Sequence, residues 1–218
     1  MLEHYLKNVG LIQGGFFYKY LTNPIYSVNT PVPSGPLAGL TENIPINGPN
    51  AHITGFEAAW QQRLTFMPGA LNGLGVRANY SYTTSQATFP VGAGRTDHPT
   101  LVRTAPNNWN FDVTYDKKGL SARMGLTHND GYIWSYGGGN TKDPNGDTYL
   151  YPHTQVDAQV SYWIPRSHGV QAVVSMLNLN NEVFGFYLGA EKYPIQREYY
   201  SRTVSVGLRW TPFAEATH

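Results

Sequence analysis

The stretch Leu120-Ser-Ala-Arg-Met-Gly-Leu-Thr127 alternates apolar and polar residues at every position. A period of two places successive side chains on opposite faces of an extended chain, so this stretch predicts a β-strand with one apolar and one polar face. The same alternation recurs in residues 155–162 and 109–115 and, further away, in 56–66, 74–83 and 203–210. Helical periodicity appears nowhere at length. The sequence therefore predicts an all-β protein.

The length of these stretches favours strands that cross a membrane. They run to about 10 residues, whereas strands of soluble proteins have about 5–6, and a tilted transmembrane strand needs roughly 9–11. A soluble sandwich would show the same alternation, but it explains neither this length nor the low charge. Aromatic residues lie toward the ends of the apolar faces, as in the two girdles of an outer-membrane barrel: Phe66, Trp109, Tyr115, Tyr151, Tyr162 and Trp210.

The connections between the strands alternate between short and long. Outer-membrane barrels have this asymmetry, with short periplasmic turns and long extracellular loops. The short connections are 7–10, 68–73, 116–119 and 165–169, and the long ones are 22–50, 84–107, 130–153 and 180–197. We expect an antiparallel up-and-down meander of nine strands near 2–6, 11–21, 51–66, 73–84, 106–115, 120–129, 152–163, 169–178 and 199–211.

Composition excludes several classes of protein. Charged residues make up 13% of the chain, about half the usual share of roughly 25%, and the net charge of +1 argues against a nucleic-acid binder that works by bulk charge. The chain has no cysteine, which rules out cysteine nucleophiles, Fe–S clusters and cysteine-based zinc sites. No apolar run is long enough for a transmembrane helix.

The two ends point to a piece of a larger barrel. The N-terminal residues contain Glu3 and have no apolar core, so they do not resemble a secretory signal. Nine strands put Met1 on the extracellular side, whereas single-chain bacterial barrels have an even number of strands. We therefore expect residues 1–213 to be an incomplete barrel segment and 214–218 a short tail. Two alternatives are a complete small outer-membrane barrel, acting as a passive pore or structural anchor, and an enzyme built on such a barrel.

Several stretches resemble the C-terminal barrel of TonB-dependent outer-membrane receptors, and the resemblance runs from about residue 2 to 213. They are Gly15-Phe-Phe-Tyr-Lys-Tyr-Leu-Thr-Asn-Pro-Ile25, Ile53-Thr-Gly-Phe-Glu57, Leu74-Gly-Val-Arg-Ala-Asn-Tyr-Ser-Tyr82, Pro106-Asn-Asn-Trp-Asn110 and Leu177-Asn-Leu-Asn-Asn181. The final strand is similar to the assembly signal read by the barrel-insertion machinery, through Gly207, Trp210 and Phe213. Family members usually end on the aromatic residue, but here five residues follow Phe213.

The resemblance implies a receptor that captures a scarce nutrient of the siderophore-iron, cobalamin or carbohydrate class. It implies TonB, a plug domain, the remaining barrel strands and outer-membrane lipid as partners, in the outer membrane of a Gram-negative bacterium. The plug and the TonB-contacting box are absent from these 218 residues. The resemblance implies neither a cofactor nor covalent catalysis, and we expect no enzyme and no nucleic-acid partner.

Candidate binding residues fall into two groups. Extracellular loops carry the expected ligand contacts, mainly aromatic side chains able to stack on flat ligands: Arg95, His98, Tyr132, Trp134, Tyr136, Tyr149, Phe186 and Tyr187. The polar strand faces carry residues expected to line the lumen and contact the plug by charge-assisted hydrogen bonds: Glu57, Arg63, Arg77, Asp112, Arg123, Asp157 and Arg209.

Metal and catalytic motifs are not expected. Asp143-Pro-Asn-Gly-Asp147 spaces acids and amides as calcium loops do, but Thr148 and Thr154 stand where the EF-hand loop needs Gly and Glu. A Pro-Asn-Gly turn explains the segment better. The seven histidines form no metal-ligating motif, and the sequence has no phosphate-binding loop or nucleophile elbow.

Overall fold

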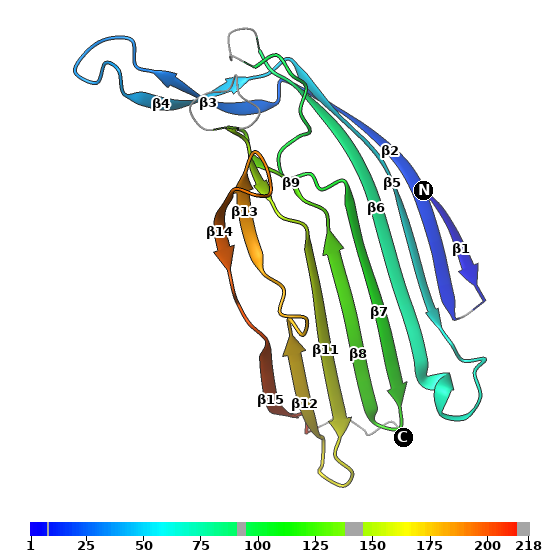
Figure 1. Ribbon diagram of the computed structural model, residues 1–218. Coiled ribbons are helices and arrows are strands. Elements are labelled where there is room, and N and C mark those ends of the chain that lie inside the picture. The colour runs from blue at the N-terminus through cyan, green and yellow to red at the C-terminus, as the bar shows by residue number, and fades with distance from the viewer. Residues whose placement is uncertain (8, 91–94, 138–145, 213–218) are drawn as a thin grey trace.

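The computed structural model describes the whole chain except residues 8, 91–94, 138–145 and 213–218. Nine strands form one antiparallel sheet, in which each strand pairs with the next of the set (Figure 1). Across the sheet they are β1 (Leu2–Leu6), β2 (Gly10–Thr22), β5 (Asn50–Arg63), β6 (Leu74–Thr88), β7 (Asn107–Lys117), β8 (Leu120–Asn129), β11 (His153–Trp163), β12 (Val170–Leu177) and β15 (Thr203–Trp210).

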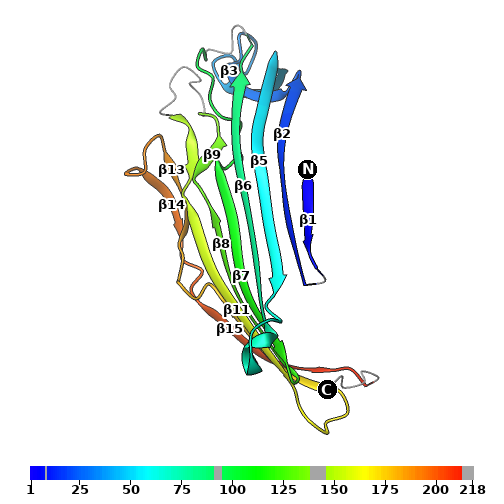
Figure 2. The same ribbon diagram turned by 90° about the vertical axis from the view of Figure 1, so that its right-hand side faces the viewer.

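These are the nine strands that the sequence predicted, and no observed end differs from its predicted position by more than four residues. Figure 2 shows the sheet from the side as one curved layer. Among the described strands, β1 and β15 each pair with one neighbour and not with each other, so the sheet is a partial barrel that does not close.

Strand register gives the sheet one apolar and one polar face. One row of facing residues runs Val113, Met124, Ala158, Met176 and Val204 across β7, β8, β11, β12 and β15. The neighbouring positions on these strands are mostly polar. Many large apolar side chains of the apolar face are exposed, which is unfavourable for a surface in contact with water. They include Phe16, Phe111, Met124, Val160, Val206, Leu208 and Trp210.

The short connections gather at one end of the sheet. The geometry of the tightest one accounts for the glycine in its sequence. β7 and β8 are joined by Lys118 and Gly119 alone, with φ angles of 51° and 75°. Positive φ at both central residues is the geometry of a type I′ turn, which matches the twist of the two strands. Between β5 and β6 the chain makes a short 3₁₀ helix, η1 (Gly69–Gly73). No helix of the described chain has the length and hydropathy to cross a membrane.

The long connections gather at the opposite end and contain six strands that sequence reasoning did not predict (Figure 1). Residues 22–50 fold into a projecting hairpin, β3 (Ile25–Pro31) and β4 (Thr41–Asn47). The third and fourth long connections combine into one small sheet of order β14-β13-β10-β9. Its strands are β9 (Tyr132–Ser135), β10 (Thr148–Leu150), β13 (Phe184–Leu188) and β14 (Pro194–Glu198).

The buried hydrophobic residues lie at this long-loop end rather than along the sheet. In the part of the chain that the structure describes, the sheet is a single layer with no second layer against it, so its strands bury no core of their own. The buried apolar residues of the described chain are Tyr26, Ala51, Ala87, Phe89, Ala105, Ile133 and Leu150.

Candidate functional site

Three long loops meet in an aromatic cluster formed by Tyr26, Phe89 and Tyr136. The Tyr26 and Phe89 ring centroids lie 4.7 Å apart, and those of Phe89 and Tyr136 lie 5.0 Å apart in an edge-to-face arrangement. Ile46 and Leu101 pack against the cluster. The cluster therefore fixes the positions of the 22–50, 84–107 and 130–153 loops relative to one another.

A buried ion pair lies beside this cluster. The Arg95 guanidinium donates to Asp147 Oδ1 and Oδ2 at 2.7 and 2.6 Å, and to Asp97 Oδ1 and Oδ2 at 2.7 and 2.9 Å. The Arg95 and Asp147 side chains are 2% and 1% exposed. Asp147 Oδ1 also accepts a hydrogen bond from the Gly137 backbone N–H. The guanidinium carbon lies 5.0 Å from the Tyr136 ring centroid.

The pKa values of this region follow from burial and from these contacts. Burial favours the neutral form of Arg95, but hydrogen bonds to Asp147 and Asp97 outweigh it and raise the pKa, so Arg95 stays charged. Burial raises the pKa of Tyr136, so its phenol stays neutral. We expected Arg95 to contact a ligand. The structure buries the Arg95 side chain, which links two loops, and its contact with a ligand stays a prediction.

The other expected ligand contacts lie mainly on the small loop sheet. On one side, Trp134 meets Phe186 at 5.2 Å between centroids, and the Arg103 guanidinium lies 4.3 Å from the Trp134 ring. Tyr132 adjoins Trp134. Tyr149 and Tyr187 stack at 5.1 Å with their planes 7° apart.

The remaining two expected contacts lie apart from these aromatic groups. Tyr136 belongs to the aromatic cluster with Tyr26 and Phe89. His98 is exposed in the second long loop. Six of the eight expected loop residues therefore contact another aromatic side chain, in three groups. These are Tyr132 with Trp134 and Phe186, Tyr149 with Tyr187, and Tyr136 with Tyr26 and Phe89.

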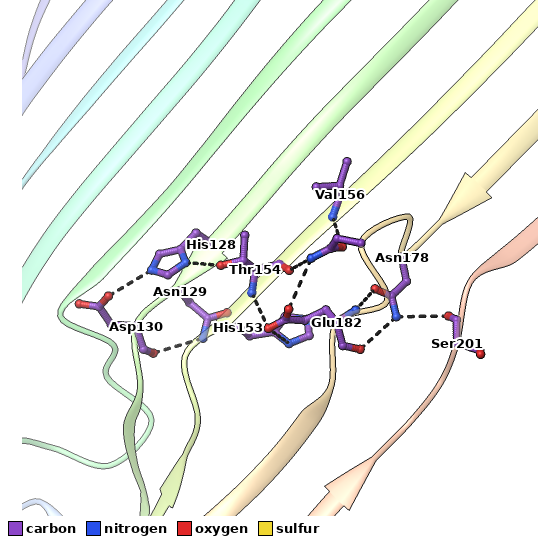
Figure 3. Close-up of polar contacts among 10 residues, drawn as sticks. His128, Asn129, Asp130, His153, Thr154, Val156, Asn178, Glu182 and Ser201 are labelled. Carbon is purple, nitrogen blue, oxygen red and sulfur yellow. Dashed lines mark hydrogen bonds and ion pairs between the residues drawn. The ribbon is translucent and has the colours of Figure 1, made fainter. Parts of the chain in front are cut away.

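The motif Leu177–Asn181 explains how β12 ends while β11 continues (Figure 3). Beyond Leu177, the Asn180 amide replaces the missing strand: its Oδ1 accepts from the Val156 N–H at 3.0 Å, and its Nδ2 donates to the Thr154 carbonyl at 2.6 Å. Asn178 lies in the left-handed region, with φ 55°. Its Nδ2 donates to the Ser201 carbonyl at 3.2 Å, and its Oδ1 accepts from the Glu182 N–H at 2.6 Å.

A second group of hydrogen bonds continues along the same rim (Figure 3). The His128 ring contacts Thr154 Oγ1 at 2.7 Å and Asp130 Oδ1 at 3.1 Å, and the Asn107 amide also donates to Asp130. Although partial burial acts in the opposite direction, these hydrogen bonds lower the pKa of Asp130. Since these side chains bond to groups on neighbouring strand ends, the rim serves to join those ends.

The seven residues expected to face the lumen all lie on the polar face. One row runs Arg77, Asp112, Gly125 and Asp157 across β6, β7, β8 and β11. A Cβ on Gly125 would lie 2.6 Å from Asp112 Oδ1, so the glycine makes room for that carboxylate. Register places Glu57, Arg63, Arg123 and Arg209 on the same face.

The polar face also carries a hollow. Asp112, Arg123, Asp157 and Gln159 line a cavity of about 210 Å³. None of the seven charged residues forms a salt bridge with another residue of the described chain. Their charges therefore face the space on the polar side of the sheet.

Two of the three residues expected to form the assembly signal are described. Gly207 lies on the polar face of β15, opposite Val173. Trp210 ends the strand on the apolar face, and its indole N–H donates to the His168 carbonyl at 3.1 Å. Phe213 and the tail 214–218 lie outside the described residues.

Metal-binding groups are not found in the parts of the chain that the structure describes, where no three His, Asp or Glu side chains come together. Most of the turn considered for calcium falls within 138–145, outside the described residues. The carboxylate of its last residue, Asp147, forms an ion pair with Arg95.

A curved antiparallel sheet with one apolar face, one polar face and long loops at one end defines the class of outer-membrane β-barrels. Residues 2–181 match the family described as TonB dependent receptor-like, beta-barrel. The chain belongs to this family, and its sheet is part of the receptor barrel. Members are transport receptors of the Gram-negative outer membrane. No curated protein sequence matches the chain.

Solved structures with the same fold include several receptors. The siderophore receptor PiuA from Acinetobacter baumannii matches with a TM-score of 0.62 and 16% identity, over 94% of this chain and 26% of that chain. The copper transporter OprC matches with a TM-score of 0.63 and 15% identity, over 94% and 29%. The ferric enterobactin receptor PfeA of Pseudomonas aeruginosa, as a G324V mutant, matches at 0.60 and 16%, over 94% and 29%. This chain thus spans less than a third of the length of these receptors.

Proposed function

We propose that this chain is a barrel segment of a receptor that takes up a scarce nutrient across the outer membrane with energy supplied through TonB. The observation that carries the proposal is the division of the sheet into two faces. An exposed apolar face from β2 to β15 fits lipid, and the unpaired charges of the polar face fit a wet lumen. The nutrient belongs to the siderophore-iron, cobalamin or carbohydrate class.

The two edge strands favour this proposal over a small passive pore. Because all nine strands alternate in direction, β1 and β15 run the same way. Closing β1 onto β15 would create one parallel seam in an antiparallel barrel. Further strands between these two edges remove that conflict. The proposal therefore includes the remaining barrel strands as partners, with outer-membrane lipid around them and the barrel-insertion machinery for assembly.

The charged row on the polar face supports contact with a plug. Arg77, Asp112 and Asp157 lie in line across three of the central strands, with the side chain of Arg123 beside them. Charge-assisted hydrogen bonds from a plug domain to such groups would hold the plug in the barrel. TonB would act on that plug, so this segment supplies the wall against which the plug moves.

Uptake by the complete receptor tests the proposal. The receptor would be expressed in a strain lacking its own receptors, with and without functional TonB. Cells would be given labelled ferric siderophores, cobalamin and oligosaccharides. Uptake of at least one of these, lost without TonB, supports the proposal. Equal uptake with and without TonB would instead show a passive pore, and uptake at the level of vector controls would contradict both.

The mass of the native polypeptide is an independent check. An antibody against residues 130–150 would be used on outer-membrane and soluble fractions of the source bacterium. We expect a band several times larger than 24.2 kDa in the outer membrane. A band of 24.2 kDa in the soluble fraction would refute the membrane proposal.

A further inference from the structure

A cavity of about 350 Å³ lies between the second and third long loops. One wall comes from residues 97–106 and includes Asp97 and Thr100, and the other comes from β9 and β10 with Tyr132 and Tyr149. The Arg95–Asp147 ion pair forms part of the lining. This volume is near the lower end of small-molecule sites, which span about 300–1,000 Å³. The cavity thus has room for about one small ring.

The charges around this cavity are almost all satisfied from within the protein. Arg95 and Asp147 are 2% and 1% exposed and bind each other. Among the described lining residues Asp97 is the remaining charged group; it is 39% exposed, and both of its oxygens accept from Arg95. Each carboxylate oxygen has a second lone pair, so Asp97 still accepts hydrogen bonds from a ligand. Because Arg95 is the only cation among the described lining residues and its donors are taken by Asp97 and Asp147, the cavity disfavours an anionic ligand.

The rest of the lining combines neutral hydroxyls with apolar surfaces. Burial raises the pKa of both Tyr132 and Tyr149, so their phenols remain neutral groups that donate and accept hydrogen bonds. Among the described residues, the hydroxyl groups of Tyr132, Tyr149 and Thr100 form no side-chain hydrogen bond, and only the Thr100 carbonyl accepts one, from Tyr136. Pro99 and Pro106 supply apolar wall.

We propose that this cavity is a subsite for one neutral, polyhydroxylated ring, such as a single sugar unit. Hydroxyl groups of the ring would donate to Asp97 and exchange hydrogen bonds with Tyr149 and Thr100, while its C–H surfaces would contact the proline rings and Tyr149. The proposal rests on the proposed uptake function and assigns the carbohydrate class to it. The Arg95–Asp147 ion pair positions the two walls and leaves Asp97 as the acceptor.

Saturation-transfer NMR on the complete receptor in detergent tests the subsite. The probes are glucose, galactose, mannose and N-acetylglucosamine, with ethanolamine and citrate as cationic and anionic counter-probes. We expect saturable binding of at least one sugar and of neither counter-probe. Tyr149→Phe removes one hydroxyl and should weaken binding about three- to tenfold, the effect of one neutral hydrogen bond.

Tyr193→Phe is the matched control, because Tyr193 is an exposed tyrosine of the β13–β14 connection outside the cavity. We expect it to bind sugar as the unaltered receptor does. Binding of no sugar, displacement of the sugar by ethanolamine or citrate, or equal losses in Tyr149→Phe and Tyr193→Phe would overturn the proposal.

The failure of this subsite is distinguishable from failure of the proposed function. If labelled ferric siderophore or cobalamin enters cells in a TonB-dependent way while no sugar binds, the receptor function stands and the sugar subsite is wrong. If no substrate enters and the receptor shows no dependence on TonB, the proposed function itself fails.

Discussion

The sheet and the loop cluster, by which we mean the aromatic cluster together with the adjoining Arg95–Asp147 ion pair, are stabilised in opposite ways. The nine-stranded sheet has no core, and its large apolar side chains, such as Phe111 and Met124, point away from the protein. The loop cluster buries Phe89 and the Arg95–Asp147 ion pair as a small soluble domain would. We attribute the difference to the surroundings expected for the family: lipid on one face of the sheet and water around the loops.

The largest expected effect is in the loop cluster. Arg95→Met leaves Asp147 buried without its cation, which costs about 3–5 kcal/mol. We expect this loss in the local stability of residues 95–101 and 147–150, measured by native-state hydrogen exchange, with little change in β6–β8. Arg103→Met is the control, since Arg103 makes a partly exposed contact with Trp134. Equal effects of the two variants would mean that the ion pair does not hold the cluster.

A charge on the apolar face comes next. Met124→Arg places a cation where lipid is expected and should destabilise the folded receptor by about 2–4 kcal/mol. Thr127→Arg, on the polar face of the same strand, should change it by less than about 1 kcal/mol. Guanidinium unfolding of the receptor in lipid vesicles measures both. Similar losses would remove the distinction between the two faces.

The rim between the two regions should show an intermediate effect. Asn178→Gly keeps the left-handed backbone but removes the side chain that joins Glu182 and Ser201, at a cost of about 1–3 kcal/mol. Asn181→Gly is the control: Asn181 has φ 56° and an exposed side chain, and should cost a few tenths of that. Faster hydrogen exchange of the Glu182 amide, which donates to Asn178 Oδ1, in the first variant alone would confirm that Asn178 holds the chain beyond β12 in place.

The smallest effect is at the opposite end of the sheet. Lys118→Asn puts a residue that tolerates positive φ into the type I′ turn and should stabilise the hairpin by about 0.5–1 kcal/mol. Gly119→Ala should destabilise it, because φ is 75° there. Unfolding midpoints in vesicles measure both changes. A loss of stability in Lys118→Asn would mean that the turn has a different geometry.

The sheet could be predicted from the sequence because the apolar and polar residues that form its two faces alternate along each strand. Alternation such as that of residues 120–127 requires no knowledge of any partner, and the short turns set the order of the strands. The same alternation placed Asp112, Arg123 and Asp157 on one face, as the register shows.

The loop cluster could not be predicted in this way, because its contacts join distant residues. Arg95 and Asp147 lie 52 positions apart, and nothing near either of them in the sequence indicates the other. Strands β9 and β10 have four and three residues, too few to show a period. The motif Leu177–Asn181 resembles the receptor family, but its role depends on where β12 ends against β11, which only the structure shows.

The most direct test of the central claim is the environment of successive side chains along β8. The chain has no cysteine, so single cysteines at residues 121–127 of the receptor, its other cysteines removed, would carry a fluorophore in vesicles. We predict quenching by brominated lipid at Ala122, Met124 and Leu126, and quenching by aqueous iodide at the positions between them. Uniform quenching along the strand, or strong lipid quenching on both faces, would contradict the account.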